Sequence, residues 1–367
     1  MKTNRSAPDF LLLILTIALV GFGIVMVYSA SFTISYWEHN DKWFITSKQI
    51  IYAIVGLILM FIAMNIKVEF YKKTFLLFLF LSIVLLVLVF VPGVGMVLND
   101  ARSWIGVTIA GKTLSIQPVE FAKIGLLLYL SVLLAKKGEN VRDFKSGIVP
   151  PLIIILLFFG LVFVQPDLGS SMILVIAAGI LLIAAGARWL HIIGLAVAGG
   201  LSLAVVLLAT GKTDRFTSFL DPWADPYNDG YHLIQSLIAF GNGGLFGAGF
   251  GKSIQKYFYL PYPHSDFIFA VIGEELGFIG ITIFLLFFML FIWRILIIAK
   301  RSTDPFGSLF ATSIAALFAI QAFINIGGVT GAIPITGVTL PFISAGGSSL
   351  ITSMIAVGII LSISREK

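Results

Sequence analysis

Asp266 is the residue whose position most strongly suggests chemistry. It closes the stretch Leu260-Pro261-Tyr262-Pro263-His264-Ser265-Asp266, and apolar residues follow it at once. Partial burial of a carboxylate raises its pKa toward neutrality, where the group becomes an effective general base. A simpler alternative is that Asp266 caps a helix by accepting hydrogen bonds from free backbone N–H groups. Position alone favours the cap, and both roles stay open.

Other ionisable residues stand inside apolar segments, where a charge is costly unless it has a partner or a function. Glu120 and Lys123 are three residues apart and therefore share one helix face. They form either an internal ion pair or a polar wall of a substrate groove, and their spacing fits both. Glu274 and Glu275 lie about two turns beyond Asp266 and must face protein or water.

Two aspartate-containing segments have the composition of turns. Gln165–Ser171 predicts a tight turn followed by a helix that Asp167 caps. Asp221, Asp225 and Asp229 recur every four residues, and two of them precede proline. Asp-Pro pairs favour turns, and a divalent cation site is the sharper alternative.

Two glycine-rich stretches break the apolar pattern. Gly241–Ser253 resembles a phosphate-binding loop, but that motif needs glycine where Phe246 stands. We expect a tight turn near the membrane surface there, with contact between its amides and a lipid-linked diphosphate as a minor alternative. Gly327–Ser349 breaks a second apolar region, and irregular backbone at membrane depth is tolerated only inside protein or beside water. This stretch therefore predicts the lining of a cavity.

The elements that position these residues must be membrane-spanning helices. The chain has 367 residues, of which 59% are hydrophobic and 11% charged, and its mean hydropathy is +1.04. A soluble protein is about one quarter charged. The absence of cysteine excludes disulfides and thiolate chemistry, and the four histidines have no metal-ligand spacing. The net charge of +6 is spread over loops, which argues against a nucleic-acid partner.

Apolar runs of about 20 residues predict roughly ten transmembrane helices in one domain, 1–367, of an all-α membrane protein. The first run is too long for a signal peptide and is expected to be an uncleaved anchor. The predicted spans are 9–31, 49–65, 74–91, 118–135, 147–164, 168–187, 190–209, 267–298, 306–326 and 347–363.

The distribution of Lys and Arg orients the helices. With the N-terminus inside, the inner segments hold fifteen of these residues and the short outer loops hold four. This bias places both termini in the cytoplasm. The loop 210–266, between the seventh and eighth spans, then faces outward, and its length predicts a functional segment. Its apolar part 231–240 is expected to lie on the membrane surface or to tuck into the bundle.

The motifs taken together resemble the SEDS family (shape, elongation, division and sporulation), which includes FtsW, RodA and SpoVE. The resemblance covers almost the whole chain and is closest to the FtsW and SpoVE branch. Its most specific parts are Gln117–Lys123, Gln165–Gly169, Asp221–Gly251, His264–Gly277 and Leu340–Ser349.

The resemblance implies a peptidoglycan glycosyltransferase that polymerises lipid II, an undecaprenyl-diphosphate-linked disaccharide-pentapeptide, beside a class B penicillin-binding protein. It implies that Asp266 is the catalytic residue, and it reverses the preference for a helix cap. The substrate-binding residues that it implies or that stand on the outer face are Arg102, Trp104, Glu120, Lys123, Arg215, Lys252, Lys256 and Ser344.

Glycosyl transfer from a lipid diphosphate needs no ATP, and cations are expected to stabilise the departing diphosphate. Arg102, Lys112, Arg215, Lys252 and Lys256 are the outer basic residues available. No cofactor is required, although a divalent cation (Mg²⁺ or Mn²⁺) could share this task.

Four positions depart from the family pattern: Val119, Tyr262, Ser265 and Ala345. The departure at Ala345 argues against a substrate contact at that position. A lipid II flippase and a non-catalytic scaffold for a penicillin-binding protein remain as alternatives, the former supported by the charges within the membrane.

Overall fold

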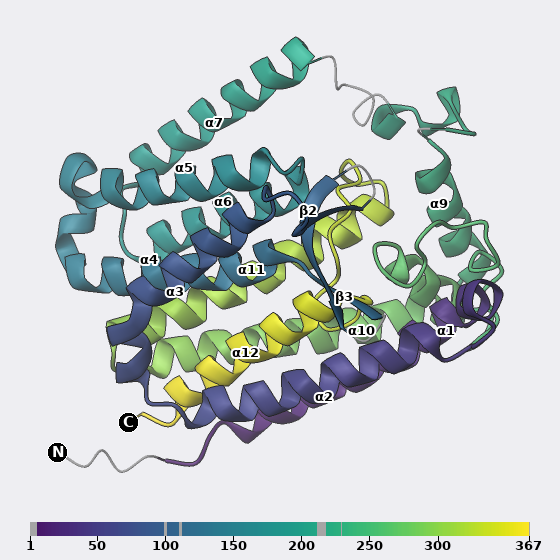
Figure 1. The fold of residues 1–367 in the computed structure, drawn as a ribbon, viewed down its shortest axis with the longest axis horizontal. Coiled ribbons are helices and arrows are strands. Elements are labelled where there is room, and N and C mark those ends of the chain that lie inside the picture. Colours follow the sequence, from purple (N-terminus) through teal and green to yellow (C-terminus); the bar gives the residue numbers. More distant parts are fainter. Residues whose placement is uncertain (1–5, 99–100, 110–111, 211–217, 229, 367) are drawn as a thin grey trace.

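The structure, a computed structural model, describes residues 6–98, 101–109, 112–210, 218–228 and 230–366. Within these residues the chain is a bundle of apolar helices (Figure 1), because lipid offers no partner for backbone N–H and C=O groups and helices satisfy them internally. The helices of the bundle are α1 (Phe10–His39), α2 (Phe44–Asn65), α3 (Val68–Leu88), α4 (Pro118–Lys137), α5 (Val149–Phe163), α6 (Leu168–Ala184), α7 (Trp189–Thr210), α10 (Ile268–Arg301), α11 (Pro305–Val329) and α12 (Gly347–Ser364).

All ten predicted spans are helical. Eight of the described helices are long and apolar enough to cross a membrane, and two shorter apolar helices correspond to the predicted spans 168–187 and 190–209. Helix α1 extends eight residues beyond its predicted end, to His39. A short helix in the long outer loop, α9 (Tyr231–Gly243), packs against α10 and α11, so the apolar segment 231–240 tucks into the bundle.

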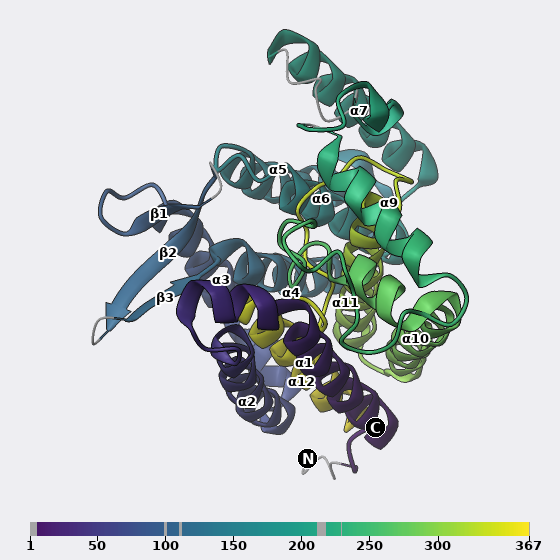
Figure 2. The same ribbon diagram turned by 90° about the vertical axis from the view of Figure 1, so that its right-hand side faces the viewer.

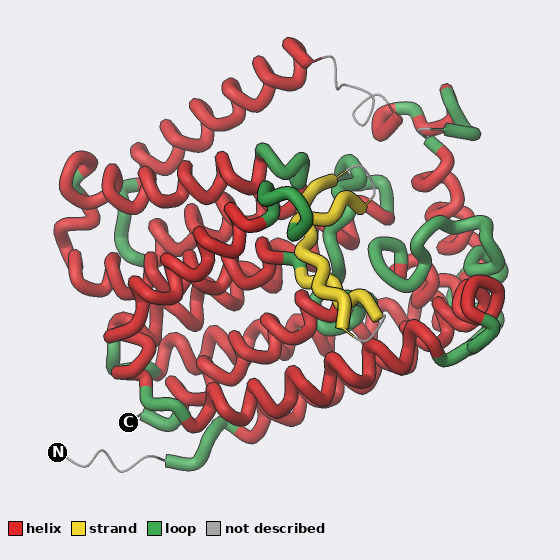
Figure 3. The backbone as a smooth tube through the Cα atoms, viewed as in Figure 1, coloured by secondary structure: helices red, strands yellow, loops and turns green. Residues whose placement is uncertain are grey.

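The first outer segment contradicts the purely helical expectation. It forms a three-stranded antiparallel sheet of β1 (Gly95–Leu98), β2 (Ala101–Ile109) and β3 (Lys112–Ile116), with β2 in the centre. Figure 3 shows these strands as the yellow part of an otherwise helical chain. Strands are possible here because the segment connects two spans outside the lipid, where water can satisfy exposed strand edges.

The interior of the bundle is formed by α4, α11 and α12, which are the most buried of the spanning helices. Helix α12 packs along α2, and α11 packs against α6 and α10. Figures 1 and 2 show α7 at the edge of the bundle, standing away from the other helices. The two chain ends lie on the same side of the molecule (Figure 1), in agreement with the predicted topology.

Contacts between the two chain ends fix this side of the bundle. The Ser6 amide donates to the carbonyl of Arg365, and the Asp9 amide donates to the Ser364 hydroxyl. The guanidinium of Arg294, on α10, donates two hydrogen bonds of 2.9 and 2.7 Å to the Asp9 carboxylate. Bidentate pairs of this kind are geometrically specific. They hold the start of α1 against α10.

Helix α10 is broken at Gly277, whose φ is 66° and ψ −171°. The break leaves four backbone groups without their helical partners, and the glycine-rich turn of the outer loop satisfies all four. The amides of Phe278 and Ile279 donate to the carbonyls of Gly244 and Leu245 at 2.9 and 3.1 Å. In return, the amides of residues 248 and 249 donate to the carbonyls of residues 274 and 275 at 2.9 and 3.0 Å. The turn and the broken helix form one interlocked unit.

Replacement of Gly277 by alanine should destabilise the protein. Its backbone conformation belongs to a region that only glycine occupies readily, so strain alone costs about 1–3 kcal/mol. A Cβ there would also lie 2.3 Å from the Gly247 nitrogen. We expect a lower thermal unfolding midpoint of the purified protein in detergent.

Gly160→Ala is the matched control, because Gly160 lies within α5 and a Cβ at this position meets nothing within 4 Å. It should leave the midpoint unchanged or raise it, since alanine favours helix by about 0.5–1 kcal/mol. Equal midpoints for Gly277→Ala and the wild type would contradict the interlocked arrangement.

Candidate active site

Asp266 lies two residues before α10, where a helix-capping carboxylate is often found. The N-cap of α10 is instead Phe267, and no side chain caps the helix. The carboxylate of Asp266 therefore does not take the simpler role that position alone favoured. It lines a pocket instead.

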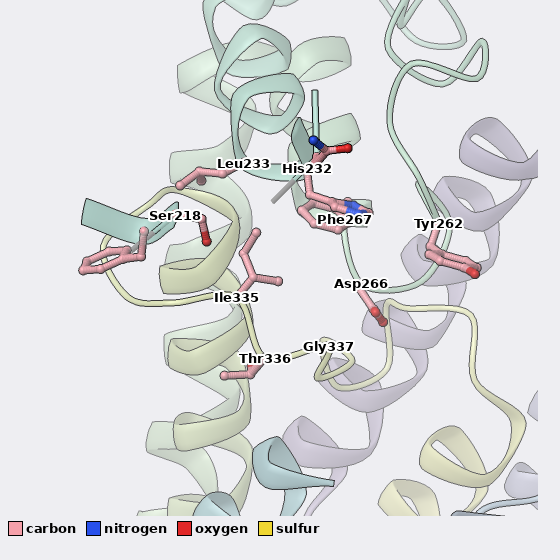
Figure 4. A pocket seen from close by; sticks show the side chains of 11 residues that line it. Ser218, His232, Leu233, Tyr262, Asp266, Phe267, Ile335, Thr336 and Gly337 are labelled. Atoms are coloured by element: carbon pink, nitrogen blue, oxygen red, sulfur yellow. The ribbon is translucent and has the colours of Figure 1, made fainter. Parts of the chain in front are cut away.

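This pocket has a volume of about 330 Å³ and is lined mainly by three segments (Figure 4). Helix α9 contributes His232 and Leu233, the irregular segment after α11 contributes Ile335–Gly337, and the end of the outer loop contributes Tyr262, Asp266 and Phe267. The prediction that the break within Gly327–Ser349 lines a cavity is confirmed. Ser218, Phe219 and Asn228 complete the lining.

Buried polar side chains hold the backbone around Asp266. The amide group of Asn325, on α11, donates to the carbonyl oxygens of Asp266 and Val338 at 2.8 and 2.7 Å. The Ser344 hydroxyl donates to the Ser265 carbonyl at 2.7 Å and accepts from the Leu340 amide at 2.8 Å. The two irregular segments are thus tied to each other and to α11, which fixes the carboxylate in the pocket.

Burial is the largest influence on the Asp266 carboxyl and raises its pKa to about 6. That pKa already includes a hydrogen bond from Ser265, which lowers it, and the negative charge of Asp167, which raises it. A carboxyl with a pKa close to neutrality is suited to general base catalysis. Burial lowers the pKa of His264 to about 4 and also lowers the pKa of His232, so both imidazoles are neutral at neutral pH.

The turn before α6 brings Asp167 to this region. Its carboxylate accepts a hydrogen bond of 2.9 Å from the Ser170 amide and caps α6, as predicted. The next residues pack closely on the pocket wall, because a Cβ at Gly169 would lie 2.8 Å from the Thr336 carbonyl oxygen. A side chain larger than hydrogen would push this wall away.

Residues 10–367 match the family of cell cycle proteins that comprises FtsW, RodA and SpoVE. The chain belongs to this family. Stage V sporulation protein E of Bacillus subtilis (strain 168) is 45% identical to it over 367 residues, which cover 100% of this chain and 99% of the relative. The probable peptidoglycan glycosyltransferase FtsW of Trichlorobacter lovleyi is 41% identical over 357 residues, covering 97% and 93%. Both relatives come from the predicted branch of the family.

Solved structures of the FtsW/RodA/SpoVE type have the same fold over nearly the whole chain. A protein from a peptidoglycan synthase complex that coordinates polymerization and crosslinking superposes with a TM-score of 0.81 at 28% identity, covering 98% of both chains. RodA of Thermus thermophilus superposes with a TM-score of 0.72 at 28% identity, covering 98% and 97%. Together with the apolar helices, this family membership makes the chain a multi-pass protein of the bacterial cytoplasmic membrane.

In this member of the FtsW/RodA/SpoVE family, Glu120 and Lys123 form a buried ion pair on α4. The Lys123 ammonium donates to the Glu120 carboxylate at 2.8 Å, and their side chains are 2% and 7% exposed. The internal ion pair is therefore present, and the low exposure leaves little of it for a substrate to touch. Neither residue is among the described residues that line the Asp266 pocket.

Lys256 was expected to be a cation available to substrate on the outer face, but it is buried and paired. Its side chain is 0% exposed, and its ammonium donates to the Glu275 carboxylate at 2.8 Å. The Ser29 hydroxyl on α1 donates to the same carboxylate at 2.6 Å, and the ammonium lies 4.7 Å from the centre of the Phe32 ring. The buried Glu275 carboxylate provides the counterion for the buried Lys256 ammonium. Through these contacts Lys256 joins the outer loop to α1 and α10.

Glu274 is stabilised by hydrogen bonds from the same outer loop. Its carboxylate accepts from the Asn242 amide group at 3.1 Å and from the Ile254 and Gln255 backbone amides at 3.0 and 3.2 Å. The Ser253 hydroxyl is a further donor. Both glutamates therefore face protein, as predicted from the high cost of exposing a charged side chain to lipid. Two amides of the glycine-rich turn, those of residues 248 and 249, likewise donate to carbonyls of α10 and are not free to contact a diphosphate.

The remaining predicted binding residues lie on other outer elements. Arg102 and Trp104 are half-buried on β2, where the Arg102 guanidinium donates to the Val91 carbonyl at 3.5 Å. Lys252 is exposed on the outer loop. None of these three lines the Asp266 pocket as far as the described residues define it. Arg215 lies outside the described residues.

The aspartate-rich segment is a turn in the described part of the chain. The Asp221 carboxylate accepts from the Trp223 amide at 3.2 Å, and the Asn228 amide group donates to the Asp225 carboxylate at 3.0 Å. Asp229 is outside the described residues. Among the residues described, no three His, Asp or Glu side chains are grouped so that they could hold a metal ion.

Sequence reasoning did not single out His232, Asn325 or Thr336. His232 lies in the apolar segment 231–240, which was expected to lie on the membrane surface or to tuck into the bundle, and Asn325 lies within a predicted span. A polar residue inside a span is the signal that could have revealed Asn325, because such a residue needs a partner. No comparable signal marks Thr336, whose place in the pocket depends on the path of an irregular segment.

Lys256→Met should destabilise the protein, because it leaves the Glu275 charge buried without its counterion. Loss of one partner of a buried pair costs about 3–5 kcal/mol, whereas loss of both costs less. We therefore expect a lower unfolding midpoint in detergent and partial recovery when Glu275→Gln is added. Lys252→Met, at an exposed position, should leave the midpoint at the wild-type value. If the two lysine variants unfold alike, the buried pair does not stabilise the loop.

Proposed function

We propose that this protein is a peptidoglycan glycosyltransferase that polymerises lipid II into glycan strands at the outer face of the membrane. The observation that carries the proposal is the Asp266 carboxylate, which lines a pocket instead of capping α10 and has a pKa raised to about 6 by burial. The names of its FtsW relatives support the same activity. The relationship to SpoVE adds spore cortex synthesis to division and elongation as processes that this polymerisation could serve.

Asp266 is proposed to act as the general base. The hydroxyl of the acceptor sugar attacks the anomeric carbon of the donor, and its proton passes to the Asp266 carboxylate. The bond between that carbon and the diphosphate oxygen breaks, and its electron pair leaves with the undecaprenyl diphosphate. No ATP is consumed, because the donor carries its own leaving group.

The leaving diphosphate requires positive charge, and Arg102, Lys112, Arg215 and Lys252 remain as candidates on outer elements. Lys256 is excluded from this set by its pairing with Glu275. The proposal includes no resident cofactor. A divalent cation, Mg²⁺ or Mn²⁺, is compatible with it, because Mg²⁺ is often held by one or two carboxylates together with substrate phosphates.

A class B penicillin-binding protein is the proposed partner. One solved structure with the same fold belongs to a peptidoglycan synthase complex that coordinates polymerization and crosslinking. That arrangement supports a partner that crosslinks the peptides of the new strand. The alternative of a lipid II flippase relied on the charges of Glu120, Lys123, Glu274 and Glu275 within the membrane. Three of these four are held in the buried pairs Glu120–Lys123 and Glu275–Lys256.

Asp266→Asn should reduce polymerisation by about 10²–10⁴-fold, the usual contribution of a general base. The amide has nearly the same shape but does not accept the proton. The assay supplies purified protein and its partner with lipid II and measures glycan polymer.

Asp143→Asn is the matched control, because Asp143 caps a cytoplasmic segment and asparagine caps equally well. Full activity of Asp266→Asn would refute the assignment of the base. Translocation of lipid II in liposomes without polymer would support the flippase, and growth of cells that carry Asp266→Asn would support the scaffold.

The pH dependence of polymerisation should follow the raised pKa of Asp266. The base works only when it is deprotonated, so kcat/KM should be constant at high pH and fall as the pH drops through about 6. An unperturbed carboxyl would hold activity down to about pH 4. A profile without a midpoint near 6 would contradict the effect of burial on this residue.

A further inference from the structure

His232 faces the same pocket as Asp266 from a different element. It lies on α9, and its imidazole stacks on the ring of Phe267 with centroids 5.8 Å apart and planes 16° apart (Figure 4). Phe267 follows Asp266 directly in the chain. The stack therefore fixes the orientation of the imidazole relative to the segment that carries the proposed base.

The Nδ1 atom of His232 is buried and has no hydrogen-bond partner among the described residues. A proton on Nδ1 would be a buried donor without an acceptor, which is costly. The imidazole therefore stays neutral and carries its single proton on Nε2. Burial, which lowers the pKa of this group, acts in the same direction. The polar edge that His232 offers to a ligand is then the Nε2–H donor.

The lining of the pocket suits a sugar better than a diphosphate. The residues described there include no lysine or arginine, and Asp266 is their one acid. A diphosphate beside this carboxylate would meet a like charge, and the described lining offers it no compensating cation. The lining instead contains the hydroxyl and amide side chains of Ser218, Asn228 and Thr336 and the aromatic side chains of Tyr262 and Phe219. Aromatic faces and neutral hydrogen-bonding groups match the apolar faces and hydroxyls of a sugar ring.

We propose that the Asp266 pocket is the subsite for the acceptor sugar and that His232 binds this sugar by donating its Nε2–H to a hydroxyl or acetamido oxygen. The proposal rests on the proposed function, because Asp266 must take its proton from the acceptor. The diphosphate of the donor then lies outside the lining described here, nearer to the cations of the outer elements.

A purely structural histidine is the competing explanation, and His232→Phe separates the two. Phenylalanine keeps the stack on Phe267 and removes the unpartnered Nδ1, so the unfolding midpoint in detergent should not fall. The Nε2–H donor is lost, and kcat/KM for lipid II should fall about tenfold, the effect of one hydrogen bond to substrate. His232→Gln, which can return a donor near the position of Nε2, should recover part of this loss.

His191→Phe is the matched control. His191 also has a buried Nδ1 without a described partner, but it lies on α7 against Phe144, and the described lining of the pocket does not include it. Its replacement should leave kcat/KM unchanged. A fall in midpoint that accounts for the lost activity of His232→Phe, or equal losses in the two phenylalanine variants, would overturn the proposal.

Two soluble probes test which part of the substrate the pocket takes. The disaccharide of N-acetylglucosamine and N-acetylmuramic acid should inhibit the wild type and lose most of its inhibition in His232→Phe. Inorganic diphosphate should inhibit both proteins equally. If the variant instead loses inhibition by diphosphate and keeps inhibition by the disaccharide, the pocket binds the phosphates and the proposal is wrong.

The outcomes distinguish this proposal from the proposed function. A wild-type protein that makes no polymer, or an Asp266→Asn variant that retains full activity, would refute the function itself. An active wild type and an inactive Asp266→Asn variant beside a fully active His232→Phe variant would refute only the acceptor subsite.

Discussion

The exchange of backbone hydrogen bonds at the break in α10 is the constraint on which the site depends. A helix interrupted at Gly277 leaves two carbonyls and two amides without partners at a depth where water cannot replace them. The glycine-rich turn supplies all four partners and in doing so fixes the part of the outer loop that follows α9. Close approach of the two backbones requires glycine on both sides, because a Cβ at Gly243 would lie 2.1 Å from the Gly273 carbonyl oxygen.

The last residues of the outer loop, before α10, are fixed by polar contacts that converge on α11 and the irregular segment after it. Asn325 holds the backbone of Asp266, and Ser344 holds that of Ser265. Between these two parts of the loop, Lys256 is anchored to Glu275 and Ser29. A loop of about 57 residues is thus held at three places, so its last carboxylate keeps one position despite the length of the connection. Rigidity of this kind is what a general base needs, since small displacements reduce proton transfer sharply.

The sequence predicted the helices well because a backbone in lipid must satisfy its hydrogen bonds internally, which a helix does. Long apolar runs therefore indicate membrane-spanning helices directly. It predicted the Asp167 cap and the cavity at the second glycine-rich break for equally local reasons. It could not predict contacts that join distant segments. Lys256 looked like an exposed cation because its partners, Ser29 and Glu275, are remote along the chain. The strands of the first outer segment were missed because they are short and lie between two strong helical signals.

The electrostatics of the pocket also bear on the cations predicted for the diphosphate, none of which belongs to the described lining. A guanidinium or ammonium within about 4–6 Å would stabilise the charged carboxylate and lower its pKa by roughly 1–3 units. The base would then bind a proton too weakly to draw it from a sugar hydroxyl. Burial beside Asp167, without such a cation, keeps the pKa of Asp266 near 6 instead. Proton acceptance and stabilisation of the leaving diphosphate make opposite demands on local charge, and the proposed site meets both by separating them in space.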